Sequence, residues 1–588
     1  MYERSGALLE RKFREYLVPT VLMTIAISVA NVVNSIIVGN FLGRTALSAM
    51  GLCAPIAYSL NAVYLLFAVG GVTCASIAKG RREAEGANRI FTLTFAAGVS
   101  AMLILLGLLL AFVRPIALAL AQGDAGLAEL ARAYLLPLLF VGPVMMLIMG
   151  MAQFARTDGK PRVAAYIAVS ANLVNLILAF VFIRFLNMGI GGAGWATVLG
   201  YSAGVFMLLP YLLSKQRTLR FVALRADDFK LLPRIAGVGS PKAFLQGLSF
   251  LRTLVLNALI VSALGMTGMA AMTVCVNALM LASMFISGST DTLLPIVGTL
   301  YGERDIPGIR FTVRTGFRFM LAACLAVMAL FLIIPSAVGR MFGINTPESI
   351  AVVEPALRMY ALSLPLYGVN TMLQSFYQTT GRVKLASMIV FLNGFVFVTL
   401  FALLLARWNA SFIWLAFVLA EAAAFIAAMC VGARIRTKEG AHGMLLLRKE
   451  AQDVRLDLSI PATVEAASGL SEQVIAFCRE NGVDELGAMR VGIAVEEMAA
   501  NTARYGHKRA KGMIDALVRV ARQEIILRLR DDGTPFDPTK YKPEEEEDFA
   551  VGGIEVVRRL AKDISYTRQV GFNVTIITVP RVVLEEAA

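Results

Sequence analysis

Two side chains near the C-terminus have the types and spacing of a magnesium-dependent phosphate site. The run Glu496-Glu497-Met-Ala-Ala-Asn501 places Glu497 and Asn501 four residues apart, on one face of a predicted helix. A carboxylate can orient or deprotonate an attacking group, and an amide oxygen is a hard ligand that suits Mg²⁺. By itself the pair is equally compatible with an exposed pair of glutamates on a solvated helix.

Two further clusters supply the other parts of a nucleotide pocket. The run Asp531-Asp532-Gly533-Thr534-Pro535-Phe536-Asp537 follows a predicted strand, where an acidic acceptor can take the exocyclic amine of adenine. A glycine beside it lets the backbone approach the ring. Gly552-Gly553 opens a predicted helix, whose free N–H groups and dipole favour phosphate. Taken singly, these clusters are also typical of an ordinary turn and a helix cap.

The segment that carries these clusters alternates between strand and helix patterns. We expect strands at 454–460, 512–520, 523–530, 563–570 and 573–579, and helices at 463–481, 484–505 and 553–562. About 140 residues are enough to bury a core of their own. The sequence contains no G-x-x-x-x-G-K-[ST] motif, so a P-loop engine is excluded.

In this order the three clusters resemble the N, G1 and G2 boxes of the GHKL ATPase fold, and most closely the branch of anti-sigma-factor serine kinases. The resemblance covers about 455–580 and implies an α+β sandwich that binds ATP and Mg²⁺. It implies these roles: Glu497 as catalytic base, Asn501 as magnesium ligand, Asp531 as adenine reader, Gly533 and Phe536 as walls of the base pocket, Gly553 beside phosphate, and Thr575 near the adenine. Val551 stands where the first glycine of the third box is expected, and we interpret the acidic run Glu544–Asp548 as a solvated loop.

The rest of the chain has the composition of a membrane protein. The sequence is 57% hydrophobic and 16% charged, whereas a soluble protein carries about 25% charged residues. Residues 1–447 hold 35 Lys and Arg against 17 Asp and Glu, and residues 448–588 hold 20 against 24. The basic excess lies between hydrophobic runs, where positive charge marks cytoplasmic loops rather than a nucleic-acid site. Six cysteines without a CxxC spacing, and two histidines, argue against a zinc or thiol redox centre.

Twelve hydrophobic runs are long enough to cross a bilayer as helices. They lie at 14–42, 46–79, 88–113, 129–155, 161–185, 190–214, 236–264, 268–300, 311–338, 350–380, 384–406 and 410–435. Counted together with the adjoining ends of the runs, the N-terminus, the even-numbered loops and the stretch after the last run carry 26 Lys and Arg, and the odd-numbered loops carry seven. This asymmetry predicts a multi-pass protein of the bacterial inner membrane with both termini in the cytoplasm.

The hydrophobic part repeats itself at one constant offset, the one that separates Pro19 from Pro241. Further pairs at this offset are Gly43 and Gly265, Cys53 and Cys275, Gly80 and Gly302, Pro143 and Pro365, and Gly159 and Gly381. Two six-span halves in the same orientation predict a transporter that binds its substrate between the halves. We therefore expect an N-lobe at 1–220, a C-lobe at 221–440, a linker at 441–453 and an ATP-binding domain at 454–588.

The first span, with Asn31-Val-Val-Asn34-Ser-Ile-Ile-Val-Gly39, opens a 6+6 repeat that resembles the multidrug and toxic compound extrusion (MATE) family over residues 1 to about 440. The resemblance implies an antiporter that exports organic cations or amphipathic solutes against H⁺ or Na⁺. Where similar proton-coupled members carry Asp, this chain has Asn34 and Ala179, and an amide cannot exchange a proton near neutral pH. Asn31 and Asn34 share a helix face, as do Asn172 and Asn175, and these amides either line a polar cavity or bond helix to helix.

Charged residues inside predicted spans are functional candidates, because a charge in lipid is costly. Asp291 lies deep in the eighth span, and Arg252 and Lys242 lie in the seventh. An Asp291–Arg252 or Asp291–Lys242 pair is either a coupling site or a fixed ion pair of the C-lobe, and we favour the coupling site. We interpret Glu421, in the twelfth span, as pointing toward an interface.

These patterns predict an all-α membrane protein of 12 helices with a C-terminal α+β GHKL domain. Its partners would be a small-molecule solute and the lipid bilayer, and we expect it to bind no nucleic acid. The function that we favour is a secondary-active efflux transporter with a cytoplasmic ATP-binding regulatory domain. The alternatives are a membrane-anchored serine kinase acting on a STAS-like or sigma-factor-like protein, and a flippase for lipid-linked precursors.

Overall fold

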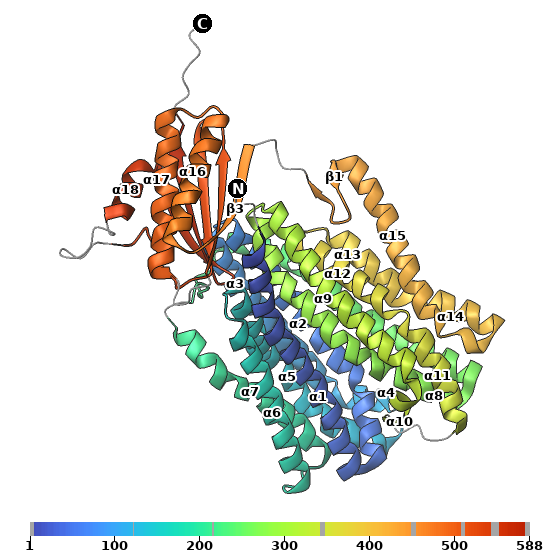
Figure 1. The fold of residues 1–588 in the computed structure, drawn as a ribbon. Coiled ribbons are helices and arrows are strands. Elements are labelled where there is room, and N and C mark those ends of the chain that lie inside the picture. Colours follow the sequence, from blue (N-terminus) through green and yellow to red (C-terminus); the bar gives the residue numbers. More distant parts are fainter. Residues whose placement is uncertain are drawn as a thin grey trace. The chain divides into compact units, whose positions relative to one another are not determined.

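The computed structural model describes residues 5–121, 123–214, 217–341, 347–448, 454–506, 512–541 and 552–581. The chain divides into two compact units (Figure 1). The membrane unit comprises Glu15–Asp305 and Thr312–Arg448, and the smaller unit comprises Met1–Arg14, Ile306–Phe311 and Lys449–Ala588. The division after Arg448 falls inside the stretch 441–453 that the sequence assigns to a linker, and the domain bounds themselves stay predictions.

The N-lobe is helical throughout the part that the structure describes. Its helices are α1 (Ala7–Leu52), α2 (Ala54–Gly80), α3 (Ala84–Ala111), α4 (Val113–Leu120), α5 (Ala125–Thr157), α6 (Pro161–Arg184) and α7 (Gly189–Leu213). Residues 46–52, which we predicted as the start of the second span, instead belong to a short helical segment between the kink at Gly43 and the start of α2 at Ala54.

The C-lobe repeats this pattern with more interruptions. Its elements are η1 (Ala226–Leu231), α8 (Leu232–Gly302), α9 (Ile306–Ile333), α10 (Pro335–Met341), α11 (Pro347–Ala361), α12 (Leu364–Thr379), α13 (Val383–Phe391), η2 (Leu392–Val396), α14 (Phe397–Trp408), η3 (Ala410–Phe412) and α15 (Leu415–Glu439). A two-stranded hairpin of β1 (Ala441–His442) and β2 (Leu447–Arg448) follows α15.

Among the described residues, eleven helical segments are long and apolar enough to cross a membrane. The predicted tenth span, 350–380, is broken into α11 and α12, neither of which reaches spanning length by itself. The break falls just before Pro365, which lies in the first turn of α12, where the missing backbone N–H of proline costs no helical hydrogen bond. The membrane fold class is confirmed, with this one span built from two pieces.

The duplication read from the sequence is also visible in the backbone. Gly43 and Gly265, one of the matching pairs, interrupt α1 and α8 with φ values of 83° and 63°. Gly159 and Gly381, another matching pair, end their helices at φ values of 82° and 81°. Only glycine adopts this left-handed region without strain, so the same backbone turn recurs at the same place in both halves.

The two lobes meet closely where α2 and α8 end. A Cβ atom on Gly80 would collide with the carbonyl oxygen of Thr299, and a Cβ atom on Gly302 would collide with that of Ile77. Because Ile77 and Thr299 are also separated by the repeat offset, the contact is symmetric between the halves. Glycine at both positions lets the helix backbones touch directly.

The C-terminal domain is a five-stranded antiparallel sheet with helices packed on it (Figure 1). The strands are β3 (Val454–Pro461), β4 (Met513–Val520), β5 (Glu524–Asp531), β6 (Asp563–Gln569) and β7 (Phe572–Pro580), in the order β3-β4-β5-β7-β6. The helices are α16 (Val464–Glu480), α17 (Glu485–Asn501) and α18 (Gly552–Leu560), and a π-helical turn, η4 (Thr502–Gly506), follows α17. The predicted α+β sandwich is confirmed.

Local signals explain where these elements begin. The side chains of Thr463 and Asp484 accept the backbone N–H of Ala466 and Gly487 and so cap α16 and α17. Along β4 and β5 every second residue is buried against the helices: Ile514, Ala516, Val518, Val520, Ile525, Leu527 and Leu529. This alternation places one face of each strand in the core and defines the face that carries the candidate site.

Candidate functional site

Asn501, at the end of α17, has a buried side-chain amide that the described residues leave unpaired. Its side chain is only 6% exposed, yet both Nδ2 and Oδ1 are buried and have no hydrogen-bond partner among the described residues. Leaving a buried amide unpaired costs about 1–3 kcal/mol. The side chain therefore suits a polar group that the folded chain does not itself supply.

Glu497 lies one helical turn before Asn501 and against the start of α18. A Cβ atom on Gly553 would overlap the carboxylate oxygen Oε2 of Glu497, so a larger residue there would displace this carboxylate. Because α18 begins at Gly552, the N–H groups of its first turn have no partner within the helix. The structure thus brings together three residues that the sequence assigns to catalysis, magnesium and phosphate.

Asp531 ends β5 on the sheet face that packs against the helices. Its Oδ1 accepts hydrogen bonds from the backbone N–H of Gly533 at 2.8 Å and from Nδ2 of Asn573 at 2.8 Å. Asn573 is its cross-strand partner on β7. Thr575, two residues further along β7, shares this face, so Asp531 and Thr575 lie on the same face of neighbouring strands.

Asn573 was missed by the sequence reasoning. It also donates to the carbonyl oxygen of Thr534 at 2.9 Å, and its Oδ1 accepts from Nη1 of Arg568 at 2.6 Å and from the hydroxyl of Tyr566 at 2.8 Å. Burial raises the pKa of Tyr566, which keeps its hydroxyl a neutral donor. A single Asn in a strand gives no sequence signal, because its partners depend on the register of β5, β7 and β6.

The loop after β5 is tied to the turn that follows α17. A Cβ atom on Gly533 would collide with the carbonyl oxygen of Gly506, and the N–H of Thr534 donates to that same oxygen at 2.7 Å. Phe536 is partly exposed, with its ring centroid 5.7 Å from that of Tyr541. The predicted acidic run Glu544–Asp548 and Val551 lie outside the described residues.

The amides predicted for the N-lobe form part of one network. Nδ2 of Asn34 lies 3.4 Å from Oδ1 of Asn175, and Nδ2 of Asn175 donates to Oγ1 of Thr197 at 2.9 Å. Asn172 instead donates to the carbonyl oxygen of Ala168 on its own helix, and Asn31 is exposed outside this network. The network contains no group that titrates near neutral pH.

In the C-lobe, Asp291 pairs with Lys242 and not with Arg252. Nζ of Lys242 lies 2.6 Å from Oδ1 of Asp291, and both side chains are 19% exposed. The geometry selects one of the two predicted pairs, and the choice between coupling site and fixed ion pair stays open to experiment.

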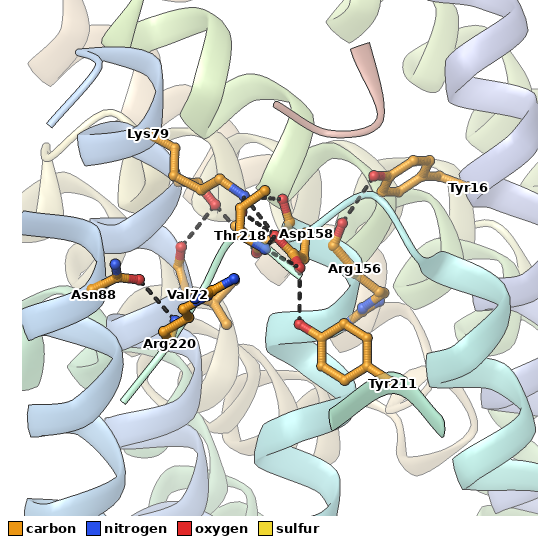
Figure 2. A network of polar contacts seen from close by, with 11 residues as sticks. Tyr16, Val72, Lys79, Asn88, Arg156, Asp158, Tyr211, Thr218 and Arg220 are labelled. Atoms are coloured by element: carbon orange, nitrogen blue, oxygen red, sulfur yellow. Dashed lines mark hydrogen bonds and ion pairs between the residues drawn. The ribbon is translucent and has the colours of Figure 1, made fainter. Parts of the chain in front are cut away.

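A second polar cluster, which we call the Asp158 cluster, was not foreseen from the sequence (Figure 2). Asp158, just after α5, accepts from Nζ of Lys79 at 3.0 Å, from the hydroxyl of Tyr211 at 3.1 Å, and from the backbone N–H and the hydroxyl of Thr218. Lys79 also donates to the carbonyl oxygen of Thr157 at 3.2 Å. The cluster fastens the ends of α2, α5 and α7 to the segment after α7, and the buried ion pair lies within the N-lobe.

Two helical lobes related by duplication and a sheet domain with these three clusters define a polytopic membrane protein with a GHKL-type ATPase domain. The sequence model of the MatE family matches residues 19–181 and 241–404, more than half of the chain. The chain therefore belongs to the MatE family. A second family model, the histidine kinase-like ATPase domain, matches residues 460–579.

Individual relatives agree with this assignment. The chain is 23% identical over 421 residues to the multidrug export protein MepA of Staphylococcus aureus (strain NCTC 8325 / PS 47), covering 70% of this chain and 91% of the relative. The fold is similar to that of the Vibrio cholerae MATE transporter VcmN in the bent form, with a TM-score of 0.66 at 19% identity, covering 72% of this chain and 96% of the other. A MOP superfamily transporter from Pyrococcus furiosus has a TM-score of 0.67 at 20% identity, with coverage of 74% and 99%.

Proposed function

We propose that the protein is a cation-coupled antiporter that exports amphipathic small molecules or organic cations, and that its C-terminal domain binds ATP and Mg²⁺ to regulate transport. Membership of the MatE family supports the transport role. The relative MepA is a multidrug export protein, which favours such solutes. The charge asymmetry of the loops favours both termini in the cytoplasm of the bacterial inner membrane, on the side where ATP is available.

The buried, unpartnered amide of Asn501 is the observation that carries the nucleotide part of this proposal. Its Oδ1 would bind Mg²⁺, the first turn of α18 would hold phosphate beside Gly553, and Asp531 would accept the amine of adenine. Asn573 holds the Asp531 carboxylate in that orientation. When bound, Mg²⁺ would supply charge neutralisation for the phosphates.

Nucleotide can bias transport only if the domain binds it with different affinity in the two transport states. The test is solute flux by the full chain in proteoliposomes under an imposed H⁺ or Na⁺ gradient, with and without MgATP inside. We expect MgATP to change the flux of the wild type and to have no effect on Asn501→Ala. Absence of flux across a panel of organic cations under both gradients would refute transport, and flux indifferent to MgATP would refute regulation.

A second candidate function is phosphotransfer by the C-terminal domain. It is favoured by the position of the Glu497 carboxylate, which lies against the backbone at the start of α18, where phosphate would bind. Transfer of label from ATP to a serine of a STAS-like or sigma-factor-like protein would establish it. Glu497→Ala should then abolish labelling and leave solute flux intact, whereas labelling by Glu497→Ala would rule out this base.

A further inference from the structure

A second carboxylate lies inside the C-lobe, and among the described residues no ion pair includes it. Glu421, on α15, is 8% exposed. Its Oε2 accepts from Nδ2 of Asn370 on α12 at 2.6 Å and from Nδ2 of Asn393 in η2 at 3.2 Å. Three spans, the tenth, eleventh and twelfth, therefore converge on one carboxylate oxygen.

The orientation of the Asn370 amide is set by its contacts. Its Nδ2 also donates to the backbone carbonyl oxygen of Glu421 at 2.9 Å. Because both acceptors belong to Glu421, the NH₂ group of the amide faces that residue. Oδ1 of Asn370 is consequently left buried without a partner, on a residue with no exposed surface. A carboxylate faced by N–H groups is not an oxygen cage for a metal ion, and among the described residues no cluster of three or more His, Cys, Asp or Glu is placed to hold one.

The charge of Glu421 is not neutralised by an ion pair. Among the residues that the structure describes, Asp291 has Lys242 at 2.6 Å, whereas no Lys or Arg nitrogen lies within 4.0 Å of Glu421. The charged or titratable groups that act on Glu421 from neighbouring elements are Arg252 of α8, Tyr360 of α11 and Tyr367 of α12. A carboxylate buried at membrane depth without a paired cation is costly while ionised, and binding a proton removes that cost.

The local backbone also singles out this site. The helix of the eleventh span is interrupted by the π-helical turn η2, and Asn393 lies within it. Such turns insert one residue into a helix, re-aim the side chains and are frequent at functional sites.

The duplication relates this site to the N-lobe network. The repeat offset matches Asn393 with Ala171, the neighbour of Asn172, so the eleventh and twelfth spans repeat the fifth and sixth. The N-lobe spans carry only amides and a hydroxyl in their network, from Asn34, Asn175 and Thr197. The corresponding region of the C-lobe carries a titratable group instead, the carboxylate of Glu421.

We propose that Glu421 is a proton-binding site that couples transport, whichever role the Asp291–Lys242 pair has, so that the driving ion is H⁺. The carboxylate binds one H⁺ to become a neutral acid, and its Oε2 can keep the hydrogen bonds that Asn370 and Asn393 donate to it. Release of the same proton on the other side of the membrane regenerates the carboxylate. This inference rests on the antiport function proposed above.

The test compares Glu421→Gln with Glu129→Gln, which removes a carboxylate on the exposed start of α5, where the side chain is 65% exposed. The full chain in liposomes is assayed for H⁺-driven net efflux and for counterflow, the exchange of labelled against unlabelled solute without a gradient. We expect Glu421→Gln to lose net efflux at least tenfold and to keep counterflow, whereas Glu129→Gln keeps both. Unchanged net efflux in Glu421→Gln, or flux driven only by Na⁺, would overturn the proposal.

Infrared difference spectroscopy provides a readout that needs no transport. Lowering the pH should produce one protonated carboxyl band in the wild type and in Glu129→Gln that is missing from Glu421→Gln. Asn393→Ala should shift the pH at which this band reaches half of its intensity. A spectrum of Glu421→Gln identical to that of the wild type would overturn the proposal. If the wild type transports nothing, the antiport function fails while this band still decides on Glu421. If Glu421→Gln does not fold, Glu421→Asp must show a shifted pH profile of efflux, and an unchanged profile would count against the site.

Discussion

Replacing Asn501 by leucine should stabilise the C-terminal domain and at the same time remove its response to nucleotide. Within the described part of the chain both polar atoms of this amide are buried and unpartnered, and such a group costs about 1–3 kcal/mol. Leucine has nearly the same shape and no polar atom, so the domain without nucleotide should gain that amount. A gain of this size lowers the fraction of opened domain about 5- to 150-fold.

The domain can be observed inside the full chain through Cys478. This thiol is on α16, has no exposed surface, and burial raises its pKa to about 11. Because alkylation needs an accessible thiolate, the reagent reacts with Cys478 only after the domain opens. Mass spectrometry of the peptide that contains Cys478 then gives the rate at one fixed pH.

Without nucleotide, we expect Asn501→Leu to be alkylated more slowly than the wild type, by the factor worked out above. Saturating MgATP should slow alkylation of the wild type, because ligand at 100 times the Kd stabilises the folded domain by about 2.7 kcal/mol. It should not slow alkylation of Asn501→Leu. Asn573→Leu is the matched control, because the Asn573 amide is bonded to Asp531, Thr534, Arg568 and Tyr566, and its loss should speed alkylation. Faster alkylation of Asn501→Leu, or its protection by MgATP, would refute the reasoning.

Three further substitutions test other contacts. Gly553→Ala places a Cβ atom in the Glu497 carboxylate, so binding of a fluorescent ATP analogue should fall at least tenfold; unchanged binding would show that the first turn of α18 is not the phosphate site. Lys79→Met leaves Asp158 without its cation in the buried ion pair and should destabilise the membrane unit by about 3–5 kcal/mol in thermal unfolding, and an unchanged Tm would contradict a structural role. Gly80→Leu should force the end of α2 away from α8 and increase labelling of cysteines introduced along that contact, while equal labelling in the parent protein would refute the close approach.

The candidate nucleotide site was predicted only in part from the sequence. Glu497 and Asn501 were placed on one face from helical periodicity alone, and the caps Thr463 and Asp484 marked the helix starts. Asn573 was missed because its bond to Asp531 depends on how β7 is aligned with β5, and no local pattern encodes that register.

In the membrane unit, too, the sequence predicted local and periodic features but not the contacts between distant residues. The hydropathy pattern located eleven of twelve spans, and the constant repeat offset paired Gly43 with Gly265, where the structure interrupts both helices. The partner of Asp291 was left open between two cations, because residues dozens of positions apart meet only through packing. The break before Pro365 was also overlooked, since the hydropathy of 350–380 continues across it.

What the sequence by itself determined was the set of local and periodic features: spanning helices, the duplication, the caps, and the order of the three nucleotide-site clusters. These follow from interactions within a few residues or from a repeat that any reader can align. Only the tertiary structure decided which polar groups are left without partners, among them Asn501 in the C-terminal domain and Asn370 beside Glu421 in the C-lobe. Whether a buried polar group has a partner depends on every segment packed around it, and no local sequence pattern encodes that packing.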